Sequence, residues 1–359
     1  MATATAVESK PSGSAPRKAR KNALSDGQGR LSAILLSPTL LVILVVVGIP
    51  IILSIRESLF LANDGINPET GLVESGEKFV GLQNYTDIFA GQNQVVGAYG
   101  TIDRFWNAFI NTSLFTITCV LLETILGVAM ALIMAKAFRG RGFVRAGILV
   151  PWAIPTIVSA LMWKLIFDES GVMNRILGTK ILWLADDNPA FWAVVIADVW
   201  KTAPFIGLLT LAGLQTIPAE VYEAAKVDGA NAWQQFIRIT LPMVKPTLVV
   251  AVLFRTLDTM RMFDLPWGMV GQGKYYVETL SIFAYQEAGQ QRYGPASAYS
   301  IILFVYIMLV AYLFVKILGA DVVGDAAPPK KTKRKKKRQD QEAGKSAETA
   351  ALESMGGAH

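Results

Sequence analysis

The chain has 359 residues, of which 52% are hydrophobic and 17% are charged, a balance that favours a membrane protein over a soluble domain. The formal net charge of +6 would suggest a nucleic-acid partner in a soluble protein. In a membrane protein the positive-inside rule accounts for the basic residues, and we expect no nucleic acid to bind.

The cysteine and histidine counts exclude several kinds of site. The single Cys119 lies within an apolar stretch, so no disulfide can form within the chain. The only histidine is the terminal His359, which excludes an internal histidine metal site and a histidine-containing catalytic triad. We therefore expect neither a metal nor an enzyme active site in this chain.

Six apolar stretches approach the ~20 residues that are needed to cross ~30 Å of hydrocarbon. The predicted spans are 31–55, 107–135, 146–167, 192–214, 247–267 and 297–318. The fold class is thus an all-α membrane protein with a six-helix transmembrane domain at 31–318. Polar, basic tails at 1–30 and 319–359 flank it and are expected to be disordered. The second tail carries a basic run at 330–338, which either binds anionic lipid or is a solvated anchor.

Loop charges predict the orientation of the spans. The 136–145 connection contains Lys136, Arg139, Arg141 and Arg145 and no acid, whereas the 56–106 connection is mainly acidic. Both termini and the 215–246 connection are therefore predicted to be cytoplasmic. Pro151 and Pro155 should break the start of the third span, and Pro204 should interrupt the fourth. Bent helices fit a packed bundle with a lumen, although prolines are also simply common in membrane helices.

The polar 215–246 connection reads as two short helices hinged at Gly229, a residue type that ends helices in the left-handed conformation. Asn231, with Gln234 three residues later, can cap the second helix. Four apolar residues then share one face before Pro242 closes the element: Trp233, Phe236, Ile237 and Leu241. Such a pair is either a docking surface for another subunit or an interfacial helix lying on the membrane.

Charged residues three apart occupy the fifth predicted span, namely Arg255, Asp258, Arg261 and Asp264. Charges at this depth are costly and should face protein or water. They form either a polar wall of a substrate cavity or a self-neutralising ladder near the end of the helix. Candidate aromatic platforms for a sugar ring are Trp163, Trp200, Phe263 and Tyr285.

The segment Gly268–Tyr275 nearly matches a phosphate-binding loop, but Tyr275 replaces the hydroxyl residue that holds magnesium and no strand is predicted before it. We expect no nucleotide site in this chain.

Several segments resemble one family of transporters. Glu223-Ala224-Ala225, Gly229 and the Ile239–Pro242 stretch are similar to the EAA motif of importer-type ABC transporter permeases. The segments 79–85, 200–205 and 253–264 resemble the carbohydrate-uptake, MalF-like branch, most closely its actinobacterial trehalose importers.

The resemblance implies a type I importer permease fold in the cell membrane, taking up a sugar, with a disaccharide such as trehalose expected. It implies as partners a second homologous permease, two ATPase subunits that hold ATP and magnesium, an extracytoplasmic sugar-binding protein and membrane lipids. It also implies the residues that couple to the ATPase: Glu223, Ala224, Ala225, Asp228, Gly229, Trp233, Phe236, Leu241 and Pro242. The alternatives are an ion-coupled secondary sugar transporter that needs no ATPase, and a non-transporting membrane scaffold.

Overall fold

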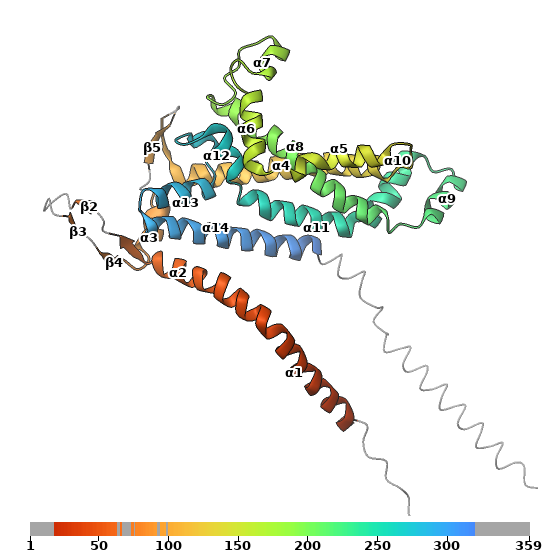
Figure 1. The fold of residues 1–359 in the computed structure, drawn as a ribbon, viewed down its shortest axis with the longest axis horizontal. Helices are drawn as coiled ribbons and strands as arrows, with labels where there is room; N and C mark the ends of the chain where they lie inside the picture. Colours follow the sequence, from red (N-terminus) through yellow and green to blue (C-terminus); the bar gives the residue numbers. More distant parts are fainter. Residues whose placement is uncertain are drawn as a thin grey trace, which may run out of the picture.

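The computed structural model describes residues 18–62, 65–66, 73–74, 76–91, 94–97 and 100–319 (Figure 1). Residues 1–17 and 320–359, and with them the predicted basic run, lie outside the described residues. Lys18–Arg30 form the start of a helix, which differs from the disordered tail that the sequence predicts there.

Within the described residues, five helical segments are long and apolar enough to cross a membrane, and a sixth crossing results if one bent helix pair counts as a single span. They are Leu31–Glu57, Arg104–Ala135, Asp187–Leu214, Ala232–Met260 and Tyr293–Ile317, with the bent pair Arg141–Ala153 and Thr156–Ile166. The elements that make up these segments are α1 (Lys18–Ile43), η1 (Leu44–Gly48), α2 (Ile49–Glu57), α4 (Arg104–Ala135), α5 (Arg141–Ala153), α6 (Thr156–Ile166), α8 (Asp187–Leu214), α10 (Ala232–Gln235), η2 (Phe236–Thr240), α11 (Leu241–Met260), α14 (Tyr293–Phe314) and η4 (Val315–Gly319).

Short elements connect these helices. Three antiparallel strand pairs follow α2, namely β1 (Phe60–Ala62) with β4 (Glu77–Phe79), β2 (Gly65–Ile66) with β3 (Val73–Glu74), and β5 (Gln94–Gly97) with β6 (Gly100–Asp103). The remaining helices are α3 (Gln83–Phe89), α7 (Val172–Leu177), α9 (Ala219–Val227), α12 (Asp264–Val270), η3 (Tyr275–Val277) and α13 (Leu280–Gly289). The strands gather at one end of the bundle, and α9 and α10 lie at the other (Figure 1). We call these the strand end and the α9 end.

The third predicted span is broken at Pro155, as expected, whereas Pro151 lies within α5 and does not break it. Ile154 and Pro155 have extended backbone between α5 and α6, whose axes differ by 95°. Pro204, in contrast, does not interrupt the fourth span, because α8 continues through it. Pro204 is buried in the helix with the most buried apolar window, where neighbouring helices support the backbone around the missing N–H.

The fifth predicted span is wrong at both ends. α10, η2 and α11 form one helical segment from Ala232 to Met260, and Pro242 lies in the first turn of α11 instead of closing an element. The five-residue π-helix η2 directly precedes Pro242; such a bulge lets a helix pass a residue that lacks its N–H. The chain then leaves the helix after Met260, and α12 begins at Asp264.

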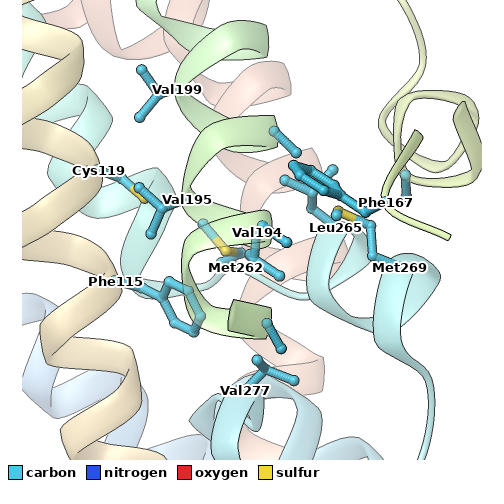
Figure 2. Close-up of a cluster of buried hydrophobic side chains, with 14 of the residues drawn as sticks. Phe115, Cys119, Phe167, Val194, Val195, Val199, Met262, Leu265, Met269 and Val277 are labelled. Atoms are coloured by element: carbon cyan, nitrogen blue, oxygen red, sulfur yellow. The ribbon is translucent and has the colours of Figure 1, made fainter. Parts of the chain in front are cut away.

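The core surrounds α8, which packs on α4, α5 and α11. Phe115 and Cys119 of α4 meet Val195 of α8, and side chains of α12 complete the cluster from the other side (Figure 2). Many residues of α8 in this core are alanines, which let neighbouring helices approach closely. In contrast, no residue of the most apolar window of Leu31–Glu57 is buried, and Figure 1 shows α1 extending away from the bundle.

A polar cluster holds the strand end together. Arg104, at the start of α4, donates to both carboxylate oxygens of Glu278 at 2.9 and 2.6 Å and to Glu287 of α13 at 3.3 Å. Arg292 binds the other oxygen of Glu287 at 3.0 Å. Because both glutamates are almost fully buried, this network fixes α13 against the first turn of α4.

Gly127 marks the tightest approach of α4 to α8. A Cβ at this position would lie 2.8 Å from the Ile206 side chain and 3.0 Å from the carbonyl oxygen of Ala203. We expect Gly127→Ala to destabilise the bundle by about 1–3 kcal/mol through overpacking, seen as a lower thermal midpoint in detergent. Gly142→Ala is the matched control, since a Cβ there meets no atom within 4 Å. Equal midpoints for the two variants would contradict this packing.

Candidate functional site

A polar cavity of about 630 Å³ opens where α5 breaks from α6. Its walls come from that break, from α8, and from the end of α11 with the start of α12. The lining residues are Trp152, Ile154, Pro155, Thr156, Asp198, Lys201, Thr202, Arg255, Asp258, Arg261, Met262, Phe263, Asp264 and Leu265. Three acids and three bases among them make the lining strongly polar and formally neutral.

Arg255 of α11 is the centre of the charges in this cavity. Its Nε donates to Glu123 of α4 at 2.6 Å, its Nη2 donates to Asp198 of α8, and its Nη1 donates to Asp258 at 2.8 Å. Arg255 and Glu123 are almost completely buried, whereas the Asp258 side chain is 53% exposed. The Arg255 guanidinium therefore joins α11 to α4 and α8, and its third partner, Asp258, lines the cavity.

Two residues of α8 extend this network. Lys201 is buried, and its Nζ donates to the carbonyl oxygen of Ile154 at 2.5 Å, where α5 ends. A cation at this position complements the negative end of the α5 dipole and supports the break. Thr202 donates to Glu123 at 2.5 Å, so the buried carboxylate has a second partner beside Arg255.

The rim of the cavity combines charges with aromatic rings. Asp258 and Arg261 form an ion pair at 3.2 Å, with side-chain exposures of 53% and 70%. Trp152 stacks on Phe205 on one side, and Phe263 stacks on Trp267 on the other. Carboxylates and a guanidinium can bind hydroxyl groups from several directions, and flat rings give apolar faces beside them. A polyhydroxylated ligand fits this chemistry.

Comparison with known proteins identifies the family. Residues 123–324 match the model of the binding-protein-dependent transport system inner membrane component. The chain belongs to this family. The matched region runs from Glu123 through α14 and includes every charged residue of the cavity.

Relatives in this family are permease proteins. The chain is 38% identical over 296 residues to the trehalose/maltose transport system permease protein MalF of Thermococcus litoralis, covering 81% of this chain and 94% of that protein. It is 35% identical over 298 residues to the trehalose transport system permease protein SugA of Mycobacterium tuberculosis, covering 82% and 91%. It is 32% identical over 299 residues to the sulfoquinovosyl glycerol transport system permease protein SmoG of Agrobacterium fabrum, covering 81% and 91%.

A solved structure has the same fold. The chain matches a bacterial alginate ABC transporter, crystallised in complex with an alginate pentasaccharide-bound periplasmic protein, with a TM-score of 0.66 and 21% identity. The match covers 81% of this chain and 94% of that one. The ABC importer permease fold predicted from the sequence is therefore confirmed.

The structure of this permease brings together five of the eight residues that the sequence suggests for a substrate pathway. Those that line the cavity are Arg255, Asp258, Arg261, Phe263 and Asp264. Asp258 pairs with both Arg255 and Arg261, as the ladder interpretation expects for these three residues, and the same residues line the cavity. A role of this cavity in binding substrate stays a prediction. Asp264 does not continue the ladder along the helix, because α11 ends before it.

The other three suggested residues do not line this cavity. Trp163 packs on Phe167 and Trp200, and Trp200 faces a separate apolar groove. Tyr285 packs on Phe263 and Trp267 and lines a second pocket beyond Phe263. An aromatic residue in a span carries no positional signal for a cavity, since most such rings pack against other helices.

Sequence reasoning missed Glu123 and Asp198, the partners of Arg255 on other helices, and it also missed Lys201. Glu123, Asp198 and Lys201 each lie within a predicted span, and an intramembrane charge is itself a signal of a functional or paired site. Trp152 was missed as well, although it lies next to Pro151 at the predicted break.

The 215–246 connection has the predicted hinge. α9 ends before Gly229, whose φ of +78° is left-handed, and Asn231 is the N-cap residue of α10. Asn231 and Gln234 form a reciprocal capping box, in which each side-chain oxygen accepts a hydrogen bond from the other's backbone N–H at 2.9 Å. Pro218 directly precedes α9 as its N-cap residue.

Polar and apolar side chains of this connection are exposed together. The residues suggested for coupling are mostly exposed, namely Glu223, Ala224, Asp228, Gly229, Trp233, Leu241 and Pro242, whereas Ala225 is buried and Phe236 is half-buried. Trp233 is 68% exposed and Val227 is 87% exposed. The rest of the chain leaves these large apolar side chains exposed. Such exposure indicates a surface that is covered by another molecule or by the membrane.

The segment that resembles a phosphate loop has a different setting. The helix α12, not a strand, leads into it, and Tyr275 begins η3. Tyr276 donates to the carbonyl oxygens of Leu184 and Ala185 at 3.1 Å, and burial raises its pKa to about 12. Among the described residues, no group of three or more His, Cys, Asp and Glu residues could hold a metal ion.

Proposed function

We propose that this chain is the permease subunit of an ATP-driven importer for a disaccharide such as trehalose. The observation that carries the proposal is the cavity around Arg255, where charged hydrogen-bonding groups and aromatic rings meet at a broken helix. Two relatives at 35–38% identity are named for trehalose, and they cover more than four fifths of this chain. A third is named for sulfoquinovosyl glycerol, so the choice of trehalose rests on the first two.

We propose that the hinge at Gly229 couples the permease to an ATPase subunit that holds ATP and magnesium. Glu223 would bind a basic residue of that subunit, Gly229 would set the angle between α9 and α10, and Trp233 would enter its cleft. The exposure of Trp233 and Val227 supports this role. Because Ala232–Met260 is a single helical segment, movement at the hinge would reach Arg255 directly.

The proposed assembly contains a second, homologous permease and two ATPase subunits, with both termini of this chain in the cytoplasm. An extracytoplasmic binding protein would deliver the sugar at the strand end. The exposed Leu31–Glu57 segment supports a further membrane subunit, because its apolar surface has little cover within the chain. That second subunit would complete the wall of the cavity.

Reconstitution distinguishes the proposal from an ion-coupled transporter. The chain, its second permease, the ATPase and the binding protein should take up trehalose into liposomes only with ATP, and trehalose should stimulate ATP hydrolysis. The chain alone, given a proton or sodium gradient, should not move the sugar. Gradient-driven uptake without the ATPase would overturn the proposal.

Asp258→Asn tests the cavity itself. The side chain is half-exposed, so we expect the loss of its ion pairs to cost no more than about 1 kcal/mol of stability. Loss of a charged acceptor for a sugar hydroxyl should weaken sugar binding by about 1.5–3 kcal/mol, seen as a KM raised at least roughly tenfold. Glu169→Gln is the control, because Glu169 is an exposed acid that does not line the cavity. Equal KM values for both variants would show that Asp258 does not contact the sugar.

A further inference from the structure

The separate apolar groove that Trp200 faces lies between α4, α5 and α8, and we call it the apolar groove. It has a volume of about 550 Å³ and is lined by Leu126 and Met130 of α4, Gly147 and Pro151 of α5, and Trp192 and Trp200 of α8, among others. Every lining residue is apolar, glycine, proline or tryptophan. The groove shares no residue with the charged cavity, so it does not belong to the substrate site proposed above.

The groove opens onto the side of the bundle. Leu126 is 43% exposed and Trp192 is 45% exposed, and both are residues of membrane-spanning helices. Lipid is the surrounding solvent at this depth, and the shape and composition of the groove suit a hydrocarbon chain.

The turn that joins α4 to α5 is strongly basic and lies at the α9 end of the groove. Lys136, Arg139 and Arg141 are exposed, and no acid occurs between residues 136 and 166. Arg145 is engaged separately, because its Nε and Nη2 both donate to the carbonyl oxygen of Met134 at 3.0 and 2.6 Å. Three cations are therefore grouped on the turn between the two helices that form the groove.

The spacing between cations and groove matches a membrane lipid. Met130 lies six residues before Lys136, and Gly147 lies six residues after Arg141. At 1.5 Å per residue, each pair is separated by about 9 Å along its helix. The headgroup and interfacial layer on each side of a bilayer is roughly 5–8 Å thick, so cations at phosphate depth place the groove at acyl-chain depth.

We propose that the apolar groove is a binding site for one anionic phospholipid. One acyl chain lies in the groove against Gly147, and the phosphate binds Lys136, Arg139 and Arg141. Charge complementarity selects an anionic headgroup over a zwitterionic one. Gly147 leaves room for the chain, since a Cβ built on it meets no atom within 4 Å.

The test is native mass spectrometry of the full-length chain, purified with its partner subunits and titrated with phosphatidylglycerol or phosphatidylcholine. We expect clear preference for phosphatidylglycerol. Gly147→Leu should fill the groove and lower phosphatidylglycerol affinity at least fivefold, without loss of any subunit. Gly289→Leu is the matched control, because Gly289 has equally open space but lies in α13, away from the groove.

A second variant tests the headgroup and does not depend on the first. Arg139→Gln with Arg141→Gln should lower phosphatidylglycerol affinity by about 25-fold, at about fivefold per basic residue, and leave phosphatidylcholine unchanged. Lys330→Gln with Lys331→Gln removes the same charge from the basic run near the C-terminus and should have no such effect.

Three results would overturn the site. They are equal affinity of the unaltered protein for the two lipids, unchanged phosphatidylglycerol binding in both variants, and loss of a membrane subunit from the Gly147→Leu complex with lipid binding intact. The last result would mean that a helix of the partner permease fills the groove. If Gly147→Leu does not accumulate, the arginine pair decides the question.

Discussion

Replacing Gly229 by valine is expected to reduce ATP-driven uptake roughly 5–30-fold. Gly229 has a φ of +78°, a left-handed conformation that costs other residues about 1–2 kcal/mol and is least tolerated by β-branched ones. If the angle between α9 and α10 must match the ATPase, this strain lowers the fraction of permease that docks on the ATPase by roughly 5–30-fold. Uptake should fall by the same factor. Radiolabelled sugar uptake and the amount of ATPase retained during purification measure the two effects.

Gly178→Val is the matched control for this experiment. Gly178 also has a left-handed backbone, with a φ of +65°, and a Cβ at either glycine meets no atom within 4 Å. It ends α7, on a connection that is predicted to lie outside the cell. Both variants should lose similar stability, and only Gly229→Val should lose the ATPase. Equal uptake by the two variants would remove the coupling role from the hinge.

Removing the cation at the centre of the bundle should have the largest effect on stability. Arg255→Met leaves Glu123 and Asp198 without their shared partner, with side-chain exposures of 0% and 8%. Breaking a buried ion pair on one side costs about 3–5 kcal/mol, so we expect low yield and a clearly lower thermal midpoint in detergent. The control is Arg261→Met, whose side chain is 70% exposed and whose loss should cost under about 1 kcal/mol.

A rescue experiment separates charge from packing. Adding Glu123→Gln and Asp198→Asn to Arg255→Met removes the uncompensated charges, and much of the lost stability should return. An Arg255→Met protein as stable as Arg261→Met would mean that the two acids do not need the cation. A rescued protein that folds but does not transport would assign the charged cluster of Arg255, Glu123 and Asp198 to the pathway as well as to the fold.

Local signals in the sequence predicted the parts of the structure that depend on neighbouring residues. The hinge at Gly229, the capping box of Asn231 with Gln234 and the break at Pro155 all follow from backbone rules within one turn of chain. The pairing of Asp258 with Arg255 and Arg261 follows in the same way from helical spacing.

Features that depend on neighbours distant in the sequence were not predictable in this way. Glu123 and Arg255 are 132 residues apart, and only the packing of α4 on α11 makes them partners. Pro204 and Pro242 were expected to end or interrupt helices, yet both are accommodated, one by burial and one by the adjoining π-helix. Trp163 and Trp200 were proposed for a sugar site because they are aromatic, a property that does not distinguish a cavity from an interhelical contact.

The unbroken Ala232–Met260 segment has a mechanical consequence. Trp233 and Arg255 lie 22 residues apart on it, which is about 33 Å of rise. A tilt of about 10° around the midpoint would carry each end sideways by about 3 Å, in opposite directions. Force applied at Trp233 would therefore displace the guanidinium of Arg255. The carboxylates of Glu123 and Asp198, on two neighbouring helices, would move with it, and no intermediate loop would have to transmit the movement.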